Sequence, residues 1–292
     1  MLEAKEALRE LAQRLGAPRE ADMWEVLDRV RAAVRVLEPE DALIEYERII
    51  EEGRARCESL FVGLPQSDLV IALKPWGLLD TGWWAGYYPD GYQDSLEPCF
   101  VIRYREGVGE VGISRDLTCH ETYPGHHLQI ALADELDLPR VRREYSNLVY
   151  TEGWATYAET LAFEEGWYEN DPGSLGTYLE TRFYEAAAAV LDTGIHALGW
   201  THQQAEQFQR TMYGEPLSVH GWTDLITVRP SAYLGYWLGH YTFMTLRTSA
   251  EDAIGDSFDL REFHDVVLRN GVLPLPVLED VVEAYIEETL AD

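Results

Sequence analysis

The sequence predicts a mainly α-helical protein with one small β element, and two observations support this prediction. Apolar residues recur at helical spacing over most of the chain. Only the stretch between about residues 61 and 114 contains the β-branched and aromatic runs, bounded by turn residues, that are typical of short strands. Because 46% of the residues are hydrophobic and nine are tryptophan, the chain can build a sizeable core.

The first part of the chain is predicted to form three amphipathic helices, over residues 2–15, about 20–36 and 40–55. The segments "GAPRE" and "LEPED" separate these helices with glycine and proline. We therefore expect an N-terminal helical segment over residues 1–60 and a second part over residues 61–292. No low-complexity linker lies between the two parts, so they should form one compact unit.

The β element is predicted from two runs, "SDLVIALKPWG" and "PCFVIRYREG", within residues 61–114. The segment between them, "LLDTGWWAGYYPDGYQDSLEP", is aromatic, rich in glycine and too long for a tight turn. We interpret it as an ordered loop that walls a cleft.

From residue 115 onward the helical pattern returns. The run "RNGVLPLP" ends one helix with glycine and opens the next with prolines. The expected helices cover residues 115–134, 138–167, 172–198, 201–213, 230–250, 258–270 and 275–290.

The net charge of −29 argues against several classes of partner. Nucleic acids and anionic membrane surfaces both bind through Lys and Arg, so neither is an expected partner. No run of 18 apolar residues occurs, and the charged N-terminus "MLEAKEALRELAQRLG" lacks the apolar centre of a signal peptide. The three cysteines are scattered and give no disulfide framework. These features predict a cytoplasmic protein.

The segment "CHETYPGHHLQ", residues 119–129, holds three of the eight histidines and one glutamate. The zinc-peptidase signature H-E-x-x-H has its second histidine four residues after the first, where this chain has Pro124. On a straight helix, His126 would point roughly 120° away from His120. His127 would face the same side as His120, but about 10.5 Å further along the axis. An unbroken helix therefore cannot present His120 and His126 to one zinc ion.

The Pro-Gly pair between the histidines can break the helix. Pro124 lacks an N–H group, and its ring would clash with the carbonyl of His120 in a regular helix. Gly125 tolerates backbone angles that other residues resist, and kinks and bulges arise at such positions. A bulge that absorbs two extra residues would return His126 to the face of His120.

Two glutamates would complete a metal site. Glu121 follows the first histidine directly, where the standard signature has the base that activates a metal-bound water. The segment "LVYTEGWATYAET" supplies Glu152 as a third ligand from another helix, and Glu159 on the same face suits a partner that orients a ligand histidine. The alternative is that these histidines and glutamates are ordinary hydrogen-bonded or solvated polar groups.

At these residues the chain resembles a known family. "HETYPGHHLQ" followed by "EGWATYAE" is similar to the bacterial and archaeal family called domain of unknown function 885. Three later blocks occur in the same order, so the resemblance spans about residues 98–290. These blocks are "VLDTGIHALGWTHQQA", "PSAYLGYWLG" and "FHDVVLRNGVLPLPVLEDVV". The family resembles the gluzincin zinc peptidases and is similar in fold to the carboxypeptidase Taq family, which implies a multi-helix fold of that kind.

The resemblance implies one zinc ion per chain, with His120, His126 and Glu152 as its ligands. Glu121 would be the general base or acid. In the carboxypeptidase Taq signature a Gly-His pair carries the second ligand, which favours His126 over His127.

Gluzincins commonly place a tyrosine or histidine beside the developing oxyanion. By position, Tyr236 and His196 are the candidates for this role, with His240 and Tyr233 behind them. The implied activity is hydrolysis of a peptide or small amide, and the resemblance also implies a homodimer. Carboxypeptidase cleavage is one option, and aminopeptidase, dipeptidase and endopeptidase cleavage stay open.

The chain departs from the family pattern in three ways. It has "EAAA" at residues 185–188 where the family tends to have "RAAR", and "PSAYLGYWLG" where the family has "PGQALSYKIG". Family members are also usually about twice as long. Two alternatives therefore stay open: a catalytically silent, metal-stabilised helical scaffold or binding protein, and a metallohydrolase for non-peptide amides or esters.

Overall fold

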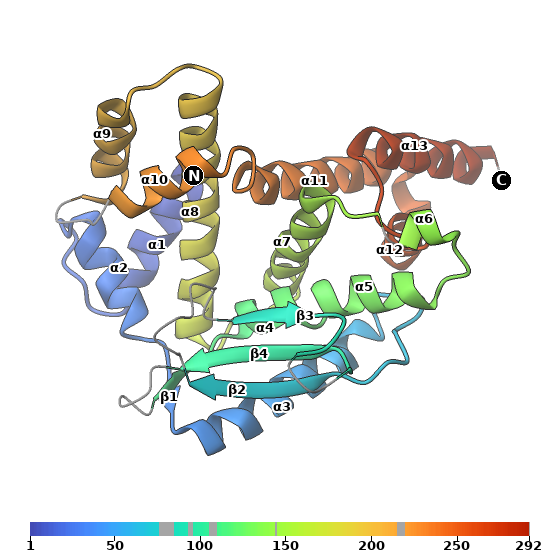
Figure 1. The fold of residues 1–292 in the computed structure, drawn as a ribbon, viewed down its shortest axis with the longest axis horizontal. Helices are drawn as coiled ribbons and strands as arrows, with labels where there is room; N and C mark the ends of the chain where they lie inside the picture. Colours follow the sequence, from blue (N-terminus) through green and yellow to red (C-terminus); the bar gives the residue numbers. More distant parts are fainter. Residues whose placement is uncertain (76–84, 93–95, 105–109, 144, 215–219, 292) are drawn as a thin grey trace.

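The computed structural model describes residues 1–75, 85–92, 96–104, 110–143, 145–214 and 220–291, and it is mainly helical, as predicted. Figure 1 shows the arrangement as layers. Helices α3 (Pro39–Cys57) and α5 (His126–Glu135) lie against the same face of a small sheet, and α4 (Arg115–Glu121) packs beside α3. Helix α7 (Leu148–Glu164) packs on α4 and α5, and α11 (Leu234–Ile254) packs on α7 across the top of the view. In the described part of the chain, no helix has both the length and the apolar character needed to cross a bilayer.

The three N-terminal helices lie close to their predicted bounds. They are α1 (Leu2–Arg14), α2 (Met23–Arg31) and α3 (Pro39–Cys57). Asp22 and Glu25 form a capping box at the start of α2, and Pro39 occupies the first turn of α3, where a missing N–H is harmless. Helices α1 and α2 pack against α8 (Pro172–His196), and α3 packs under the sheet.

The main sheet has the strand order β2-β4-β3, with β2 (Val70–Pro75), β4 (Cys99–Tyr104) and β3 (Ala85–Tyr88). Strand β2 runs parallel to β4, while β3 is antiparallel to β4 and forms an edge. A second, two-stranded sheet pairs β1 (Val36–Leu37) with β5 (Val111–Gly112). Both predicted strand runs are confirmed by β2 and β4.

The segment interpreted as a loop contains strand β3, so that interpretation was wrong for Ala85–Tyr88. The strand is only four residues long, too short for its periodicity to show, and its pairing with β4 holds it in the sheet. Residues 78–84 and 93–95 of the interpreted loop lie outside the described residues.

Two predicted helices are each divided. The 115–134 helix is α4 (Arg115–Glu121) and α5 (His126–Glu135), and the 138–167 helix is α6 (Arg140–Arg143) and α7 (Leu148–Glu164). Asn147 begins α7 by accepting hydrogen bonds from the backbone N–H groups of Val149 and Tyr150, at 3.1 and 3.4 Å. The later helices are α9 (His202–Tyr213), α10 (His220–Val228), α11 (Leu234–Ile254), the short 3₁₀ turn Gly255–Ser257, α12 (Leu260–Leu268) and α13 (Leu275–Ala291). Helix α10 was not predicted.

Helices α7 and α11 cross at two glycines. A Cβ atom on Gly239 would lie 2.0 Å from the carbonyl oxygen of Val149, and one on Gly153 would lie 2.4 Å from the Cα of Gly239. Only glycine allows the two backbones to come this close. The crossing therefore fixes α11 directly against the helix that carries Glu152.

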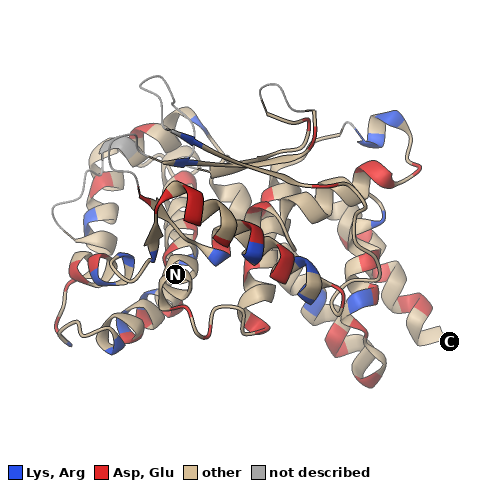
Figure 2. Cartoon of the chain, turned by 90° about the horizontal axis from the view of Figure 1, so that it is seen from below, with Lys and Arg blue, Asp and Glu red and all other residues tan. Residues whose placement is uncertain are grey.

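One hydrophobic core joins both parts of the chain. It includes Leu8 and Leu27 from the N-terminal helices, Phe100 from β4, Trp154 from α7 and Tyr285 from α13. Figure 2 shows that acidic residues occur on helices throughout the view and are not gathered in one patch. The three cysteines are buried and unpaired, as the sequence predicts.

Candidate metal and catalytic site

The helix predicted over residues 115–134 is interrupted at Pro124-Gly125, between α4 and α5. The backbone N–H of Gly125 bonds to the carbonyl of Cys119 at 2.9 Å, and that of Leu128 bonds to Thr122 at 3.2 Å. Both bonds span six residues, whereas a helical bond spans four, so the turn holds two extra residues. A Cβ atom on Gly125 would lie 1.9 Å from the carbonyl oxygen of His120, so glycine is required there.

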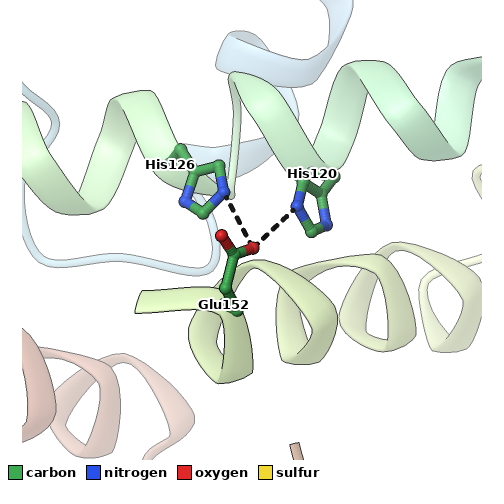
Figure 3. Close-up of side chains that lie close together, drawn as sticks. All are labelled: His120, His126 and Glu152. Atoms are coloured by element: carbon green, nitrogen blue, oxygen red, sulfur yellow. Dashed lines mark ion pairs between the residues drawn. The ribbon is translucent and has the colours of Figure 1, made fainter. Parts of the chain in front are cut away.

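This bulge brings His120, at the end of α4, and His126, at the start of α5, to one place (Figure 3). Glu152 points at both imidazoles from α7, and its Oε2 lies 3.4 Å from the Nε2 atom of each histidine. The two rings stand at 85° with centroids 4.7 Å apart. One ligand atom from each of the three residues lies within 4.8 Å of the others.

The three residues fit a zinc ion. Nitrogen and oxygen ligands at about 2.0–2.2 Å from tetrahedral zinc lie roughly 3.3–3.5 Å from one another, close to the 3.4 Å between Glu152 and each histidine. The Oε2 atom of Glu152 is buried and makes no hydrogen bond within the described part of the chain, although it faces both Nε2 atoms. Two histidines and one glutamate would leave a fourth position for water or substrate.

The charges of the cluster also favour a cation. Burial lowers the pKa of His120, but the interactions with Glu152 and Glu159 outweigh burial and raise this pKa well above its ordinary range. Burial raises the pKa of Glu152, but His126 and His120 bring that pKa far below its ordinary range. A positive charge among these groups is thus stabilised, and either a proton or a divalent cation can supply it.

A chain of buried groups holds His120 from behind. Its Nδ1 atom lies 2.7 Å from Oε1 of Glu159, one of the best buried carboxylates in the protein. Arg182 on α8 lies 3.3 Å from the other oxygen of Glu159 and also pairs with Glu185. Glu159 therefore has the position expected of a residue that fixes the ring and tautomer of a ligand histidine.

Glu121 lies beside the cluster and faces the same cavity. Its Oε2 accepts a 2.7 Å hydrogen bond from the backbone N–H of Tyr87 on the edge strand β3. This bond fixes the carboxylate of Glu121 close to His120. The unpredicted strand β3 thus helps to build the site.

Tyr236, on α11, also lies at the cluster. Its ring is nearly parallel to that of His120, at 15°, with centroids 6.3 Å apart. Burial, and then the charges of Glu152 and Glu185, raise the pKa of Tyr236, so its hydroxyl keeps its proton and can donate a hydrogen bond. The glycine crossing of α7 and α11 sets this position, because Gly239 lies one helical turn after Tyr236.

The structure does not bring His196 to the cluster. It lies exposed at the end of α8, where its Nε2 atom is 3.0 Å from the carbonyl oxygen of Ile226, and it does not line the cavity. His240 contacts Thr160 instead, with 2.9 Å between its Nε2 and the hydroxyl oxygen. Of the two reserve candidates, only Tyr233 lines the cavity.

His127 turns away from His120 and His126. Its Nδ1 atom lies 3.2 Å from the hydroxyl of Tyr87, and its ring packs edge-on against Tyr123. Burial lowers the pKa of His127 to about 4, so it is neutral at pH 7. His126, which directly follows Gly125, takes part in the cluster, whereas His127 does not.

A cavity of about 530 Å³ opens in front of the cluster. One side is formed by residues of α8 that we term the α8 wall, and the sequence patterns did not indicate them. The residues of this wall recur at the helical spacing of three and four, but nothing in that spacing shows that they line a cavity. The wall consists of Thr177, Glu180, Thr181, Tyr184, Glu185 and Ala188.

Comparison with known proteins places these features in a family. The model of the family described as "Bacterial protein of unknown function (DUF885)" matches residues 1–282. The match therefore includes residues 1–97, which the motifs alone had not assigned to it. No curated protein matches the sequence.

Two solved structures share the fold. A "putative lipoprotein" from Colwellia psychrerythraea is 30% identical, with a TM-score of 0.82 over 98% of this chain and 50% of that protein. A "putative lipoprotein of unknown function" from Shewanella oneidensis is 19% identical, with a TM-score of 0.77 over 96% of this chain and 54% of that protein. The chain thus spans about half the length of each.

Proposed function

This chain belongs to the DUF885 family of bacterial proteins, and we propose that it is a zinc-dependent metallohydrolase that cleaves peptide bonds. One observation carries the proposal: His120, His126 and Glu152 converge on one point, with the carboxylate of Glu121 facing the same cavity. The similarity in fold to the carboxypeptidase Taq peptidases is part of this proposal.

His120, His126 and Glu152 would hold the zinc, which when bound lowers the pKa of a water toward ~7 and polarises a carbonyl. Glu121 would take a proton from the attacking water and pass it to the leaving amine. Its fixed contact with the N–H of Tyr87 keeps one carboxylate oxygen occupied and leaves the other for this transfer.

Tyr236 would donate a hydrogen bond to the oxyanion that develops on the substrate carbonyl, and its raised pKa suits a donor. Glu159 would hold the Nδ1–H of His120, so that Nε2 stays free for the metal. His196 has no part in this proposal, because it does not line the cavity.

Two measurements test the proposed function. Metal analysis of the purified protein should find close to one zinc per chain. The Glu121→Gln variant should keep that zinc and lose hydrolysis of a broad peptide library. Full activity of Glu121→Gln would reject the mechanism. Bound zinc without turnover of any peptide by the unaltered protein would favour a catalytically silent, metal-stabilised protein.

A further inference from the structure

The cavity in front of the cluster has a distinct electrostatic character, and this inference about its substrate rests on the proposed function. We propose that the α8 wall selects substrates that carry a positively charged group, either a terminal ammonium or a lysine or arginine side chain. Glu185 would supply the negative charge, and Tyr184, Trp222 and Tyr233 the aromatic faces.

Six carboxylic residues line the cavity, whereas no lysine or arginine of the described residues does. Asp116 is largely uncharged at pH 7, because burial and then the charge of Glu159 raise its pKa to about 8. A divalent cation in the cluster would balance Glu121 and Glu152. Three carboxylates then remain, namely Glu159, Glu180 and Glu185.

Only two guanidinium groups pair with these three carboxylates in the described part of the chain. Arg31 binds Glu180 through two of its nitrogens, at 2.6 and 2.9 Å. Arg182 is shared between Glu159 and Glu185. When Glu185 is ionised and a divalent cation is bound, Glu159 and Glu185 therefore carry one negative charge more than Arg182 balances. In the sequence, the segments outside the described residues contain one further basic residue, Arg105.

Glu185 is the residue to which we assign this excess negative charge. Its side chain is only 11% exposed, and its Oε1 lies 3.5 Å from the hydroxyl of Thr156, one turn after Glu152 on α7. Burial, opposed by Arg182 and assisted by Glu159, raises the pKa of Glu185 to about 7. A substrate cation beside Glu185 would supply the missing charge in a poorly screened place.

An aromatic group stands in the same cavity. Tyr184 and Trp222 stack in parallel with ring centroids 6.1 Å apart, and Trp222 meets Tyr233 at 5.4 Å. All three line the cavity. Ammonium and guanidinium groups bind over such faces, whereas carboxylates do not, so this observation points to a cation independently of the glutamates.

A free substrate carboxylate is the competing anchor group, as a carboxypeptidase would require. Its candidate partner is Arg229, which interacts with the hydroxyl of Tyr233 and opposes the effect of burial on that pKa. Arg229 is exposed and does not line the cavity. A carboxylate that entered the cavity would instead meet the like charge of Glu185.

The test measures binding apart from turnover. Zinc-loaded Glu121→Gln protein is titrated calorimetrically with matched short peptides that have a free or acetylated N-terminus, a free or amidated C-terminus, and lysine or norleucine at one position. The titrations are repeated after adding Glu185→Gln or Trp222→Leu. Glu287→Gln, exposed on α13 and outside the cavity lining, makes the same change in net charge as Glu185→Gln and serves as the control.

We expect peptides with a cation to bind about tenfold more tightly than uncharged ones, and either cavity substitution to remove this preference. The control should retain it. Loss on acetylation would assign the site to the terminal ammonium, and loss on replacing lysine by norleucine would assign it to a side chain. Equal binding of all peptides, or a preference for free carboxylates that Arg229→Ala abolishes, would overturn the proposal. Failure of the proposed function would appear separately, as absence of zinc or of hydrolysis.

Discussion

The indole Nε1 of Trp154 donates a 3.0 Å hydrogen bond to the carbonyl oxygen of Pro124. This bond ties the centre of α7 to the bulge that brings the two histidines together. Because Trp154 is fully buried, the carbonyl of Pro124 has no water to replace the indole. The position of Glu152, half a turn before Trp154, is thus linked to the positions of His120 and His126.

Replacing Trp154 by Phe should therefore weaken both folding and metal binding. The substitution keeps an aromatic ring against Phe243 and removes the donor, which should cost about 1–3 kcal/mol for the unsatisfied carbonyl in addition to lost packing. Urea unfolding of the metal-free protein measures the first effect, and zinc competition with a chelator measures the second. An unchanged zinc affinity would show that the bond does not position the ligands.

Gly125→Ala should abolish zinc binding. The added methyl group would lie 1.9 Å from the carbonyl oxygen of His120, so the bulge cannot keep its shape. Gly63→Ala is the matched control, since a Cβ atom there meets nothing within 4 Å and Gly63 has no positive φ. Metal content after dialysis against zinc distinguishes the two. Equal zinc content in both variants would contradict the expected role of Gly125.

Glu159→Gln should weaken zinc binding by roughly 10–100-fold, as loss of an outer partner of a ligand histidine usually does. The amide can still contact His120, but it carries no charge to stabilise the ring. Glu165→Gln, exposed at the end of the same helix, should leave the affinity unchanged. Competition titrations with a zinc indicator compare the two variants. Loss of folding in Glu159→Gln, detected by circular dichroism, would instead assign Glu159 a structural role.

His264 should make stability depend on pH. Its Nδ1 and Nε2 atoms lie 2.8 Å from the carbonyl of Leu60 and 2.7 Å from the hydroxyl of Tyr157, and burial lowers its pKa from 6.5 to about 4. The unfolded chain therefore binds this proton more readily, so the contribution of His264 is complete above pH 6.5 and is lost as the pH falls to 4.

The loss should amount to about 3 kcal/mol, from 1.36 kcal/mol for each pKa unit. The free energy of unfolding is compared between the unaltered protein and His264→Gln at several pH values. The difference between the two should shrink by this amount between pH 7 and pH 4. A difference that does not change with pH would show that His264 does not titrate in this way.

The sequence predicted the centre of the site because its cause is local. Pro124 and Gly125 disfavour a regular helix by their own geometry, which allowed His120 and His126 to converge, and the family resemblance implied that they do. Strand β3 escaped prediction because its partner is β4 and its four residues carry no periodic pattern. Helix α10 escaped because nine residues between turns gave too short a signal.

The α8 wall was missed for another reason. Glu185 belongs to "EAAA", which was noted only as a departure from the family, and nothing local shows that this face of α8 meets a cavity. His196 lies on the same helix as Glu185 but at its far end, and only the three-dimensional path of α8 separates it from the cluster. Such residues need tertiary structure to be assigned.

Different elements of the fold carry the residues of the metal site and the wall of the cavity, and this has a practical consequence. The bulge positions the imidazoles of His120 and His126, and the close crossing of α7 and α11 at two glycines positions Glu152 and Tyr236. The wall of the cavity comes from α8. Residues of that wall such as Thr177 and Thr181 can therefore be varied to change which molecules are accepted, without altering the residues proposed for the chemistry.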